Sequence, residues 1–227
     1  NTYYGCCAAI ASAGAAVFPQ SMLWRDPEDG IFLGLYEDGE ACLTLPSGQT
    51  LRMRIRTAYP AELCVRVTFE LAEPERFCFG IRVPGWSEKS TLICGGERLA
   101  VTPGIRRLER EWRNGDVLEL TLDPRVFVLF APIYGEETIY RMNWNDGKVY
   151  PCHVTQSDEA RRYVSLRRGA LTLAADRRLG RNPEAAVHVT RADRTLSAEP
   201  VPPTAVPYPC MAAFRVQLPQ ESLLLTD

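Results

Sequence analysis

The chain has 227 residues, of which 46% are hydrophobic and 24% charged, a composition that is ordinary for globular proteins and excludes a disordered or fibrous chain. Its 26 basic and 28 acidic residues are mixed along the sequence and give a net charge of −2. This sequence shows no basic stripe, so we expect no binding to nucleic acid or to anionic lipid. The length suits one large or two modest β domains.

The start of the sequence and its cysteines bear on where the protein works. Asn1 is neither an initiator methionine nor part of a signal-peptide pattern, so we expect the natural N-terminus to lie further upstream. Eight cysteines in this length are too dilute for a disulfide scaffold, and we expect a cytoplasmic protein with free thiols. Four of them fall in strand-like runs, where a thiol acts as a small hydrophobe: Cys42, Cys64, Cys78 and Cys94.

The first predicted element is a helix over residues 8–17. Phe18-Pro19 is expected to end it, because the residue before a proline avoids the helical region. Its side chains are nearly all small and apolar, and a helix without a polar face is not stable alone at a surface. We therefore expect this helix to be buried against another element. The nearly uncharged stretch 5–23 predicts no membrane span, because it is rich in small residues and contains a proline.

From Ile31 the hydrophobic period changes to two, which indicates strands. Short β-rich runs such as "IFLGLY", "ACLTL", "ELCVRVTFEL" and "RFCFGIRV" are separated by turn residues. In "LRMRIR", three apolar residues from Leu51 to Ile55 alternate with three arginines, as in a half-buried antiparallel strand. A hairpin is predicted at Gly95-Gly96, and "DVLELTL" completes the set. Many short, evenly spaced strands predict a mainly β protein built on an antiparallel β-sandwich.

After Pro124 the pattern loosens, so a domain boundary is predicted there. "RVFVLFAPIYG" and "RRYVSLRRGALTLAAD" predict strands, whereas residues 140–158 predict a long polar connection of unknown role. "EPVPPTAVPYPC" predicts an extended connector, because proline cannot donate to a strand ladder. "AFRVQL" and "SLLLT" predict two closing strands.

Two neighbouring thiols, Cys6 and Cys7, stand before the predicted helix. Adjacent Cα atoms lie about 3.8 Å apart, below the roughly 4.4 Å minimum of a disulfide, so the two are not expected to be bonded to each other. Both could ligate one soft metal such as zinc. The alternative is that they pack in an alanine-rich helix, since free cysteine is among the most buried residue types. No CxxC or HExxH pattern supplies further ligands.

Histidine and tryptophan are the other candidate site residues. His153 and His188 have no partner at metal-ligand spacing and are expected to be surface or structural residues. The four tryptophans could be stacking platforms for sugar rings or parts of the core. They are Trp24, Trp86, Trp112 and Trp144.

Five motifs in order resemble the C-terminal half of the β-L-arabinofuranosidases of glycoside hydrolase family 127, formerly the domain of unknown function numbered 1680. The motifs are Cys6-Cys7, "TAYP" (57–60), "IRVPGW" (81–86), "EWRNGD" (111–116) and "LRRGAL" (166–171). The resemblance implies an (α/α)6 catalytic barrel followed by β-sandwich domains. Residues 1–20 would then be the last segment of the barrel, 21–124 a β-sandwich domain, and 125–227 a second β-rich region whose strands could return to the first sandwich.

The resemblance also implies a chemistry for the cysteine pair. Cys6 would be the nucleophile that attacks the anomeric carbon of an arabinofuranosyl group, and Cys6 and Cys7 would both ligate zinc. The acid/base glutamate and the remaining ligands, a glutamate and a third cysteine, would lie upstream in the barrel of the same polypeptide. The chain by itself is therefore not expected to be a complete enzyme, and its helix would pack on barrel helices that this sequence lacks. In the family "PPN" follows the pair, whereas Ala8-Ala9-Ile10 follow it here.

Three functions thus stay open for this sequence. In the first, it is the C-terminal β-sandwich part of a glycosidase whose full-length form holds zinc and binds a glycan. In the second, it is a non-catalytic module that binds carbohydrate or supports an enzyme domain. In the third, it belongs to a degenerate relative of the family that retains only the scaffold.

Overall fold

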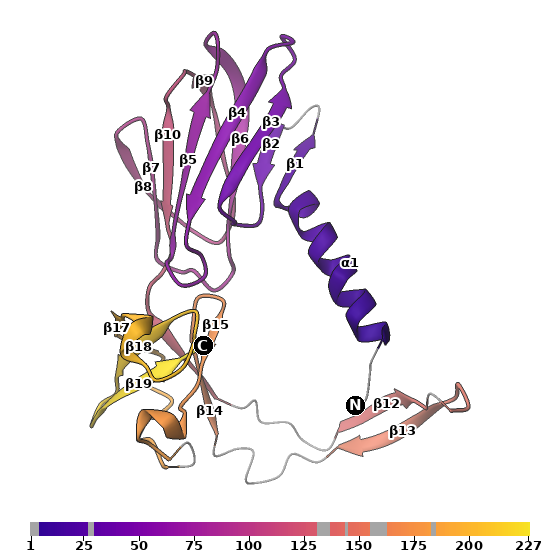
Figure 1. Ribbon diagram of the computed structural model, residues 1–227, viewed down its shortest axis with the longest axis vertical. Helices are drawn as coiled ribbons and strands as arrows, with labels where there is room; N and C mark the ends of the chain where they lie inside the picture. The colour runs from indigo at the N-terminus through magenta and orange to yellow at the C-terminus, as the bar shows by residue number, and fades with distance from the viewer. Residues whose placement is uncertain (1–4, 27–29, 131–136, 144, 155–162, 183–184) are drawn as a thin grey trace. The chain divides into compact units, whose positions relative to one another are not determined.

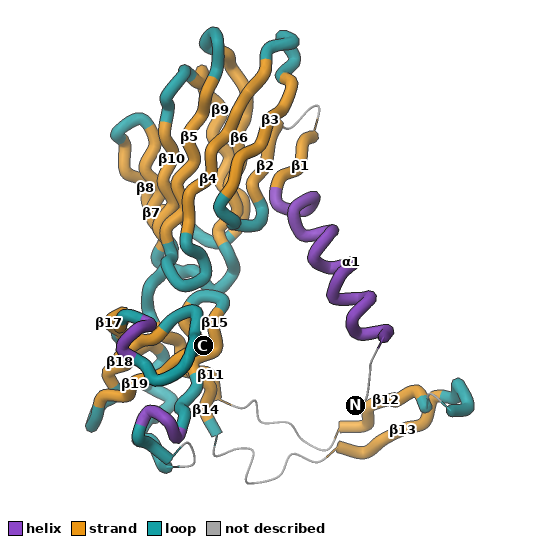
Figure 2. The backbone as a smooth tube through the Cα atoms, in the orientation of Figure 1, coloured by secondary structure: helices purple, strands orange, loops and turns teal. Residues whose placement is uncertain are grey.

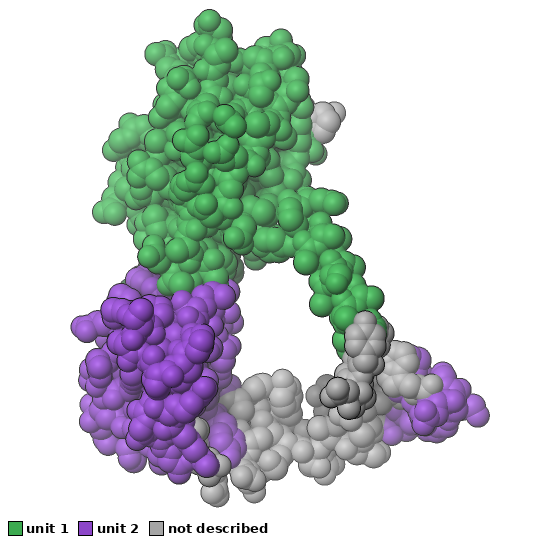
Figure 3. All heavy atoms as spheres, in the orientation of Figure 1, with its two compact units in different colours: residues 1–123 green, residues 124–227 purple. Residues whose placement is uncertain are grey.

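The computed structural model describes residues 5–26, 30–130, 137–143, 145–154, 163–182 and 185–227. The chain divides into two compact units, residues 1–123 and 124–227 (Figure 3). Among the described residues no helix combines the length and the apolar character needed to cross a membrane. The three-part domain division expected from the resemblance stays a prediction.

The first unit is one helix followed by ten strands (Figures 1 and 2). Its elements are α1 (Gly5–Met22), β1 (Leu23–Asp26), β2 (Gly30–Leu33), β3 (Gly39–Thr44), β4 (Thr50–Thr57), β5 (Cys64–Glu70), β6 (Glu75–Val83), β7 (Ser90–Cys94), β8 (Glu97–Val101), β9 (Gly104–Trp112) and β10 (Val117–Thr121). The strands form a four-stranded sheet, β1-β2-β6-β9, and a six-stranded sheet, β3-β4-β5-β10-β7-β8. One hydrophobic core takes residues from both sheets, so the predicted β-sandwich is confirmed.

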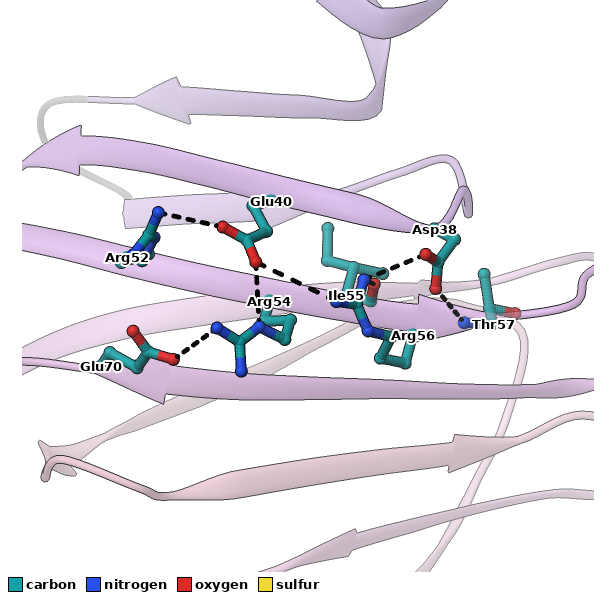
Figure 4. Close-up of polar contacts among 8 residues, drawn as sticks. All are labelled: Asp38, Glu40, Arg52, Arg54, Ile55, Arg56, Thr57 and Glu70. Atoms are coloured by element: carbon teal, nitrogen blue, oxygen red, sulfur yellow. Dashed lines mark hydrogen bonds and ion pairs between the residues drawn. The ribbon is translucent and has the colours of Figure 1, made fainter.

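Strand β4 shows why this sequence forms a sandwich. Leu51, Met53 and Ile55 are at most 3% exposed and face the core. The arginines between them point to the outer face, where they pair with acidic residues of the neighbouring strands and of the loop before β3 (Figure 4). The distances are 3.1 Å for Arg52–Glu40, 3.0 Å for Arg54–Glu40, 3.3 Å for Arg54–Glu70 and 3.0 Å for Arg56–Asp38. The predicted alternation is confirmed.

One pairing departs from the antiparallel pattern. β2 runs parallel to β6, with Ile31 opposite Phe79 and Leu33 opposite Ile81. Parallel strands need a crossover connection, and here the crossover consists of β3, β4 and β5 of the other sheet. The four-stranded sheet is therefore assembled from segments that are distant in the sequence.

The predicted helix is longer and more exposed than expected. It runs from Gly5 to Met22 and includes Pro19, so the prediction that it ends at Phe18-Pro19 is wrong. Its end is fixed instead by the sheet, because the Met22 carbonyl accepts hydrogen bonds from the N–H groups of Gly34 (2.8 Å) and Leu35 (3.4 Å). Within this chain the helix is not buried: Ile10 is 73% exposed and Val17 is 55% exposed.

The second unit contains three sheets. Its strands are β11 (Val126–Phe130), β12 (Glu137–Met142), β13 (Val149–Val154), β14 (Val164–Arg168), β15 (Leu171–Leu173), β16 (Thr195–Leu196), β17 (Ala198–Val201), β18 (Ala213–Gln217) and β19 (Ser222–Thr226), with the short helices η2 (Arg177–Leu179) and η3 (Pro203–Ala205). The sheets are β15-β14-β11-β16, β17-β18-β19 and the hairpin β12-β13. Ala174 and Thr226 exchange two backbone hydrogen bonds, of 2.7 and 3.1 Å, which link the first two sheets.

Two predicted connections in this unit are partly strands. Residues 140–158, expected to be a polar connection, contribute to the hairpin β12-β13, in which Met142 lies opposite Val149. Residues 144 and 155–158 of that segment lie outside the described residues. Asn143 and Asp146 accept hydrogen bonds from backbone N–H groups in the turn of the hairpin, of 3.0 Å each, so polar residues here build a turn. The proline-rich segment contributes β17, in which Pro200 lies at a sheet edge, where a missing donor is tolerated.

Candidate functional site

The cysteine pair lies in the first turn of α1. The helix begins at Gly5 and has no acidic residue in its first turn. Cys7 is exposed and forms no disulfide, and the side chain of Cys6 lies outside what the structure describes. The N–H groups at a helix N-terminus favour an anionic group placed there, and a thiolate is one such group. The position therefore suits thiolate chemistry better than core packing.

The donor set of the pair matches one half of a zinc site. Structural and catalytic zinc ions take cysteine sulfur readily but need at least three protein ligands. Among the described residues, no group of three or more His, Cys, Asp and Glu side chains could hold a metal ion. Cys6 and Cys7 can therefore supply two ligands, and any further ligand would have to come from outside the described part of this chain.

The other predicted site residues are dispersed. His188 is exposed, while the side chains of His153 and Trp144 lie outside the described residues. Trp112 is fully buried and Trp86 packs against the core, so both serve packing. Trp24 differs from them, because its side chain is 41% exposed on β1. The four strand cysteines also differ from one another: Cys94 is buried, Cys64 and Cys78 are partly buried, and Cys42 is exposed, which corrects the expectation for Cys42. Its position on β3 places it on the outer face opposite Arg52.

The motif "EWRNGD" builds the sandwich. Trp112 packs against Phe69 with ring centroids 4.3 Å apart, and its Nε1–H donates to the Phe77 carbonyl at 3.1 Å. Asp116 closes the following turn by accepting from the Arg113 N–H at 3.0 Å. Gly115 adopts a φ of 83°, which favours glycine in that turn. These contacts are structural.

The motif "TAYP" likewise serves packing. Tyr59 meets Tyr36 edge to face, with centroids 5.4 Å apart. Burial raises the pKa of both phenols, and for Tyr36 the shift takes the group far above its usual range. Both tyrosines are therefore neutral at physiological pH. The Tyr36 hydroxyl is buried and makes no hydrogen bond with the described residues.

The motif "LRRGAL" forms the tight turn between β14 and β15. Arg168 pairs with Leu171 across that turn, and Gly169 has a φ of 62°. The Arg168 guanidinium lies 4.3 Å from the centre of the Phe214 ring, and burial lowers the pKa of this arginine. A cation over a ring face is favourable, so this arginine helps to join β14 to the sheet that contains β18.

A pocket at one end of the four-stranded sheet is the main feature that sequence reasoning missed. It has a volume of about 550 Å³ and is lined by residues of β1, β2, β6, β9 and the loop after β3. Five of its lining residues are charged: Arg25, Asp26, Arg76, Arg107 and Glu109. They come from three strands and form no local motif, so only the folded sheet brings them together.

Comparisons with known proteins identify a family that part of the chain resembles. Residues 30–124 match the family model of the β-L-arabinofuranosidase, glycoside hydrolase family 127, middle domain. No curated protein matches the sequence.

Solved structures share its fold at low identity. A family 127 β-L-arabinofuranosidase from Geobacillus stearothermophilus T6 is 16% identical, with a TM-score of 0.59 over 99% of this chain and 34% of that chain. A structure titled glycoside hydrolase is 19% identical, with a TM-score of 0.63 over 98% of this chain and 37% of that one. A family 127 β-arabinofuranosidase is 14% identical, with a TM-score of 0.57 over 98% and 35% of the two chains.

The chain thus spans about a third of the length of these structures. Its similarity to them is a similarity of fold. The family model covers most of the first unit, including every strand of its two sheets except β1. Residues 30–124 therefore resemble the middle domain of glycoside hydrolase family 127, and the resemblance to this family indicated by the motifs is confirmed.

Proposed function

We propose that this chain is the C-terminal part of a longer, retaining glycoside hydrolase that acts on L-arabinofuranosides and uses Cys6 as its nucleophile. The observation that carries the proposal is the thiol pair in the first turn of α1, directly upstream of a family 127 middle domain. Similar structures bear the names β-L-arabinofuranosidase and β-arabinofuranosidase and are about three times as long. The chain by itself would supply the nucleophile and a scaffold.

The exposure of α1 supports the proposal that a domain upstream in the longer protein covers this helix. α1 presents apolar side chains to solvent, with Ile10 and Val17 more than half exposed. Exposed apolar surface of this kind marks an interaction site. In the longer protein, upstream helices of an (α/α)6 barrel would cover α1 and bring the acid/base glutamate to the Cys6 thiol.

The chain's own residues would then act in two steps. In the first, the Cys6 thiolate attacks the anomeric carbon, the glycosidic bond breaks, and the leaving-group oxygen takes a proton from the glutamate. A glycosyl thioether on Cys6 results. In the second, the same glutamate deprotonates water, which attacks the anomeric carbon, frees the thiolate and restores the original configuration.

Cys6 and Cys7 would also hold zinc, since thiolate sulfur is a preferred zinc donor. When bound, the metal would keep the two thiols deprotonated at neutral pH. Cys7 would have no bond to the sugar and would act only as a ligand. The sandwich would support α1, because its strand pairing fixes the C-terminal end of that helix through the Met22 carbonyl.

The test is a pair of serine variants in the full-length polypeptide. Cys6→Ser should abolish hydrolysis of an aryl β-L-arabinofuranoside, whereas Cys42→Ser, which removes an exposed thiol on the outer face of β3, should leave it unchanged. Elemental analysis should find one zinc in the parent and none after both Cys6 and Cys7 are replaced by serine. Full turnover by Cys6→Ser would refute the nucleophile and leave the chain as a non-catalytic module.

A further inference from the structure

The pocket of the first unit holds charged groups of both signs, among them Arg76 and Glu109, whose side chains are each 66% exposed. The Arg25 Nη1 donates to the Thr44 carbonyl at 2.6 Å, which anchors β1 to the other sheet. Arg76 donates from Nε (3.1 Å) and Nη2 (3.0 Å) to a single oxygen, Oε1 of Glu109. The second oxygen of Glu109 makes no hydrogen bond with the described residues. The pocket therefore offers an acceptor on Glu109 and further guanidinium donors on Arg25.

An aromatic surface adjoins these charged groups. Arg107 lines the pocket and also lies over the Phe32 ring, 5.0 Å from its centre. Phe32 stacks in turn on Trp24, with centroids 5.6 Å apart and an interplanar angle of 13°. Phe32 is 2% exposed, whereas Trp24 is 41% exposed. The sheet is shaped for these rings, because a Cβ at Gly80 would lie 2.3 Å from the Phe32 ring.

The charges in the pocket decide which ligands fit. The lining carries three guanidinium groups and two carboxylates, so neither an anion nor a cation meets charges of a single, attractive sign there. A neutral ligand that both donates and accepts hydrogen bonds satisfies both sets of groups. The volume of about 550 Å³ lies within the range of roughly 300–1,000 Å³ that is usual for small-molecule sites.

A sugar has these properties. Its hydroxyl groups donate to carboxylates and accept from guanidinium groups, while its C–H faces pack on apolar surface. The apolar part of the lining includes Phe77, whereas Ile31 and Leu45, which also line the pocket, are each 3% exposed and add little surface. We propose that this pocket is a carbohydrate-binding site for a neutral mono- or disaccharide, with Trp24 flanking it as a stacking surface for a further sugar ring. The choice of an arabinoside as the sugar rests on the proposed function, whereas the site itself does not.

The experiment measures sugar binding by the 227-residue chain. Titration calorimetry and ligand-observed NMR with methyl β-L-arabinofuranoside, methyl glucoside and inorganic phosphate as probes give the dissociation constant of each. We expect saturable binding of the arabinoside. Glu109→Gln should raise its dissociation constant at least about tenfold, because one charge-assisted hydrogen bond is lost. Asp26→Asn should weaken binding in the same direction.

Glu111→Gln is the matched control. Glu111 lies on the same strand, is exposed and is paired with Arg113 at 2.8 Å, but it does not line the pocket. Its replacement should leave binding unchanged, and circular dichroism should show that all variants are folded. If Asp26→Asn fails to fold, Glu109→Gln and Glu111→Gln alone decide.

The outcomes separate this inference from the proposed function. If the glucoside binds in a way that depends on Glu109 and the arabinoside does not bind, the sugar site is supported and an arabinoside is excluded as its ligand. Full turnover by Cys6→Ser in the longer polypeptide, with pocket binding intact, would refute only the nucleophile. Absence of saturable binding by either glycoside, equal effects of Glu109→Gln and Glu111→Gln, or preference for phosphate would overturn the sugar site.

Discussion

Replacing Trp112 by alanine tests how the sandwich core is held together. The indole is fully buried and lies among three phenylalanine rings, at centroid distances of 4.3 Å from Phe69, 5.8 Å from Phe77 and 6.1 Å from Phe79. Phe69 is itself packed edge to face on Phe79 at 5.0 Å, so it cannot easily move into the space that the substitution leaves. A cavity between the sheets is therefore expected.

The magnitude follows from this packing. Truncating a buried tryptophan to alanine costs about 3–5 kcal/mol, and the lost hydrogen bond to the Phe77 carbonyl belongs to a class worth about 1 kcal/mol. Because the neighbouring rings are held by one another, we expect a value near the upper end of that range. A domain of this size has a free energy of unfolding of about 5–15 kcal/mol, so Trp112→Ala should leave the first unit only marginally folded.

Urea unfolding followed by far-ultraviolet circular dichroism measures the effect. Trp24→Ala is the control, because Trp24 is 41% exposed and stacks on a single ring. Trp24→Ala should lower the free energy of unfolding by about 1–2 kcal/mol, which corresponds to one aromatic pair and part of the buried surface of the indole. A loss for Trp112→Ala no larger than that of Trp24→Ala would refute the packing argument.

Two further predictions concern a backbone position and a carboxylate. In urea titrations, Gly30→Ala should lower the free energy of unfolding by more than about 1 kcal/mol relative to Gly39→Ala. Gly30 has a φ of 114°, and a Cβ there would lie 2.3 Å from a carbonyl oxygen of β6, whereas a Cβ at Gly39 has no atom within 4 Å. Equal losses for the two variants would contradict this. Hydrogen bonds from the Arg178 side chain and backbone lower the pKa of Asp176 from 3.8 to about 2. The stabilising effect of the ionised Asp176 is present above about pH 4 and is lost as the pH falls through about 2. Over that interval the Tm of Asp176→Asn should therefore fall less steeply than the Tm of the wild type. Parallel plots of Tm against pH would contradict the lowered pKa of Asp176.

The sandwich could be predicted because its signals are local. In β4 each residue shows its orientation through its own polarity, and the structure places the apolar set inside and the arginines outside. The same holds for "DVLELTL", whose Leu118, Leu120 and Leu122 are fully buried. Alternation with a period of two is maintained in a β-sandwich, because a one-residue shift in the pairing register of a strand would expose all of its apolar side chains.

Elsewhere the tertiary environment overrode local preference. Pro19 lies inside α1 because the sheet holds Met22 just beyond it. The parallel pairing of β2 with β6 has no sequence signal, since nothing in either strand specifies a partner more than forty residues away. Likewise, Arg25, Arg76 and Glu109 resemble any surface charges until the sheet brings their strands together. The cysteine pair was visible from the sequence, whereas the described residues contain no group of three or more His, Cys, Asp and Glu side chains that could hold a metal ion.

The parallel β2–β6 pair also bears on how the first unit forms during synthesis. β2 ends at Leu33 but has no sheet partner on its β6 side until residues 79–81 have been made, and β6 in turn pairs with β9 up to Trp112. Pairing between such distant segments raises the contact order and slows folding. The six-stranded sheet also closes late, since β10 joins β5 to β7. A ribosome-bound chain should therefore gain protease resistance in one step, after β10 has left the exit tunnel, and not strand by strand.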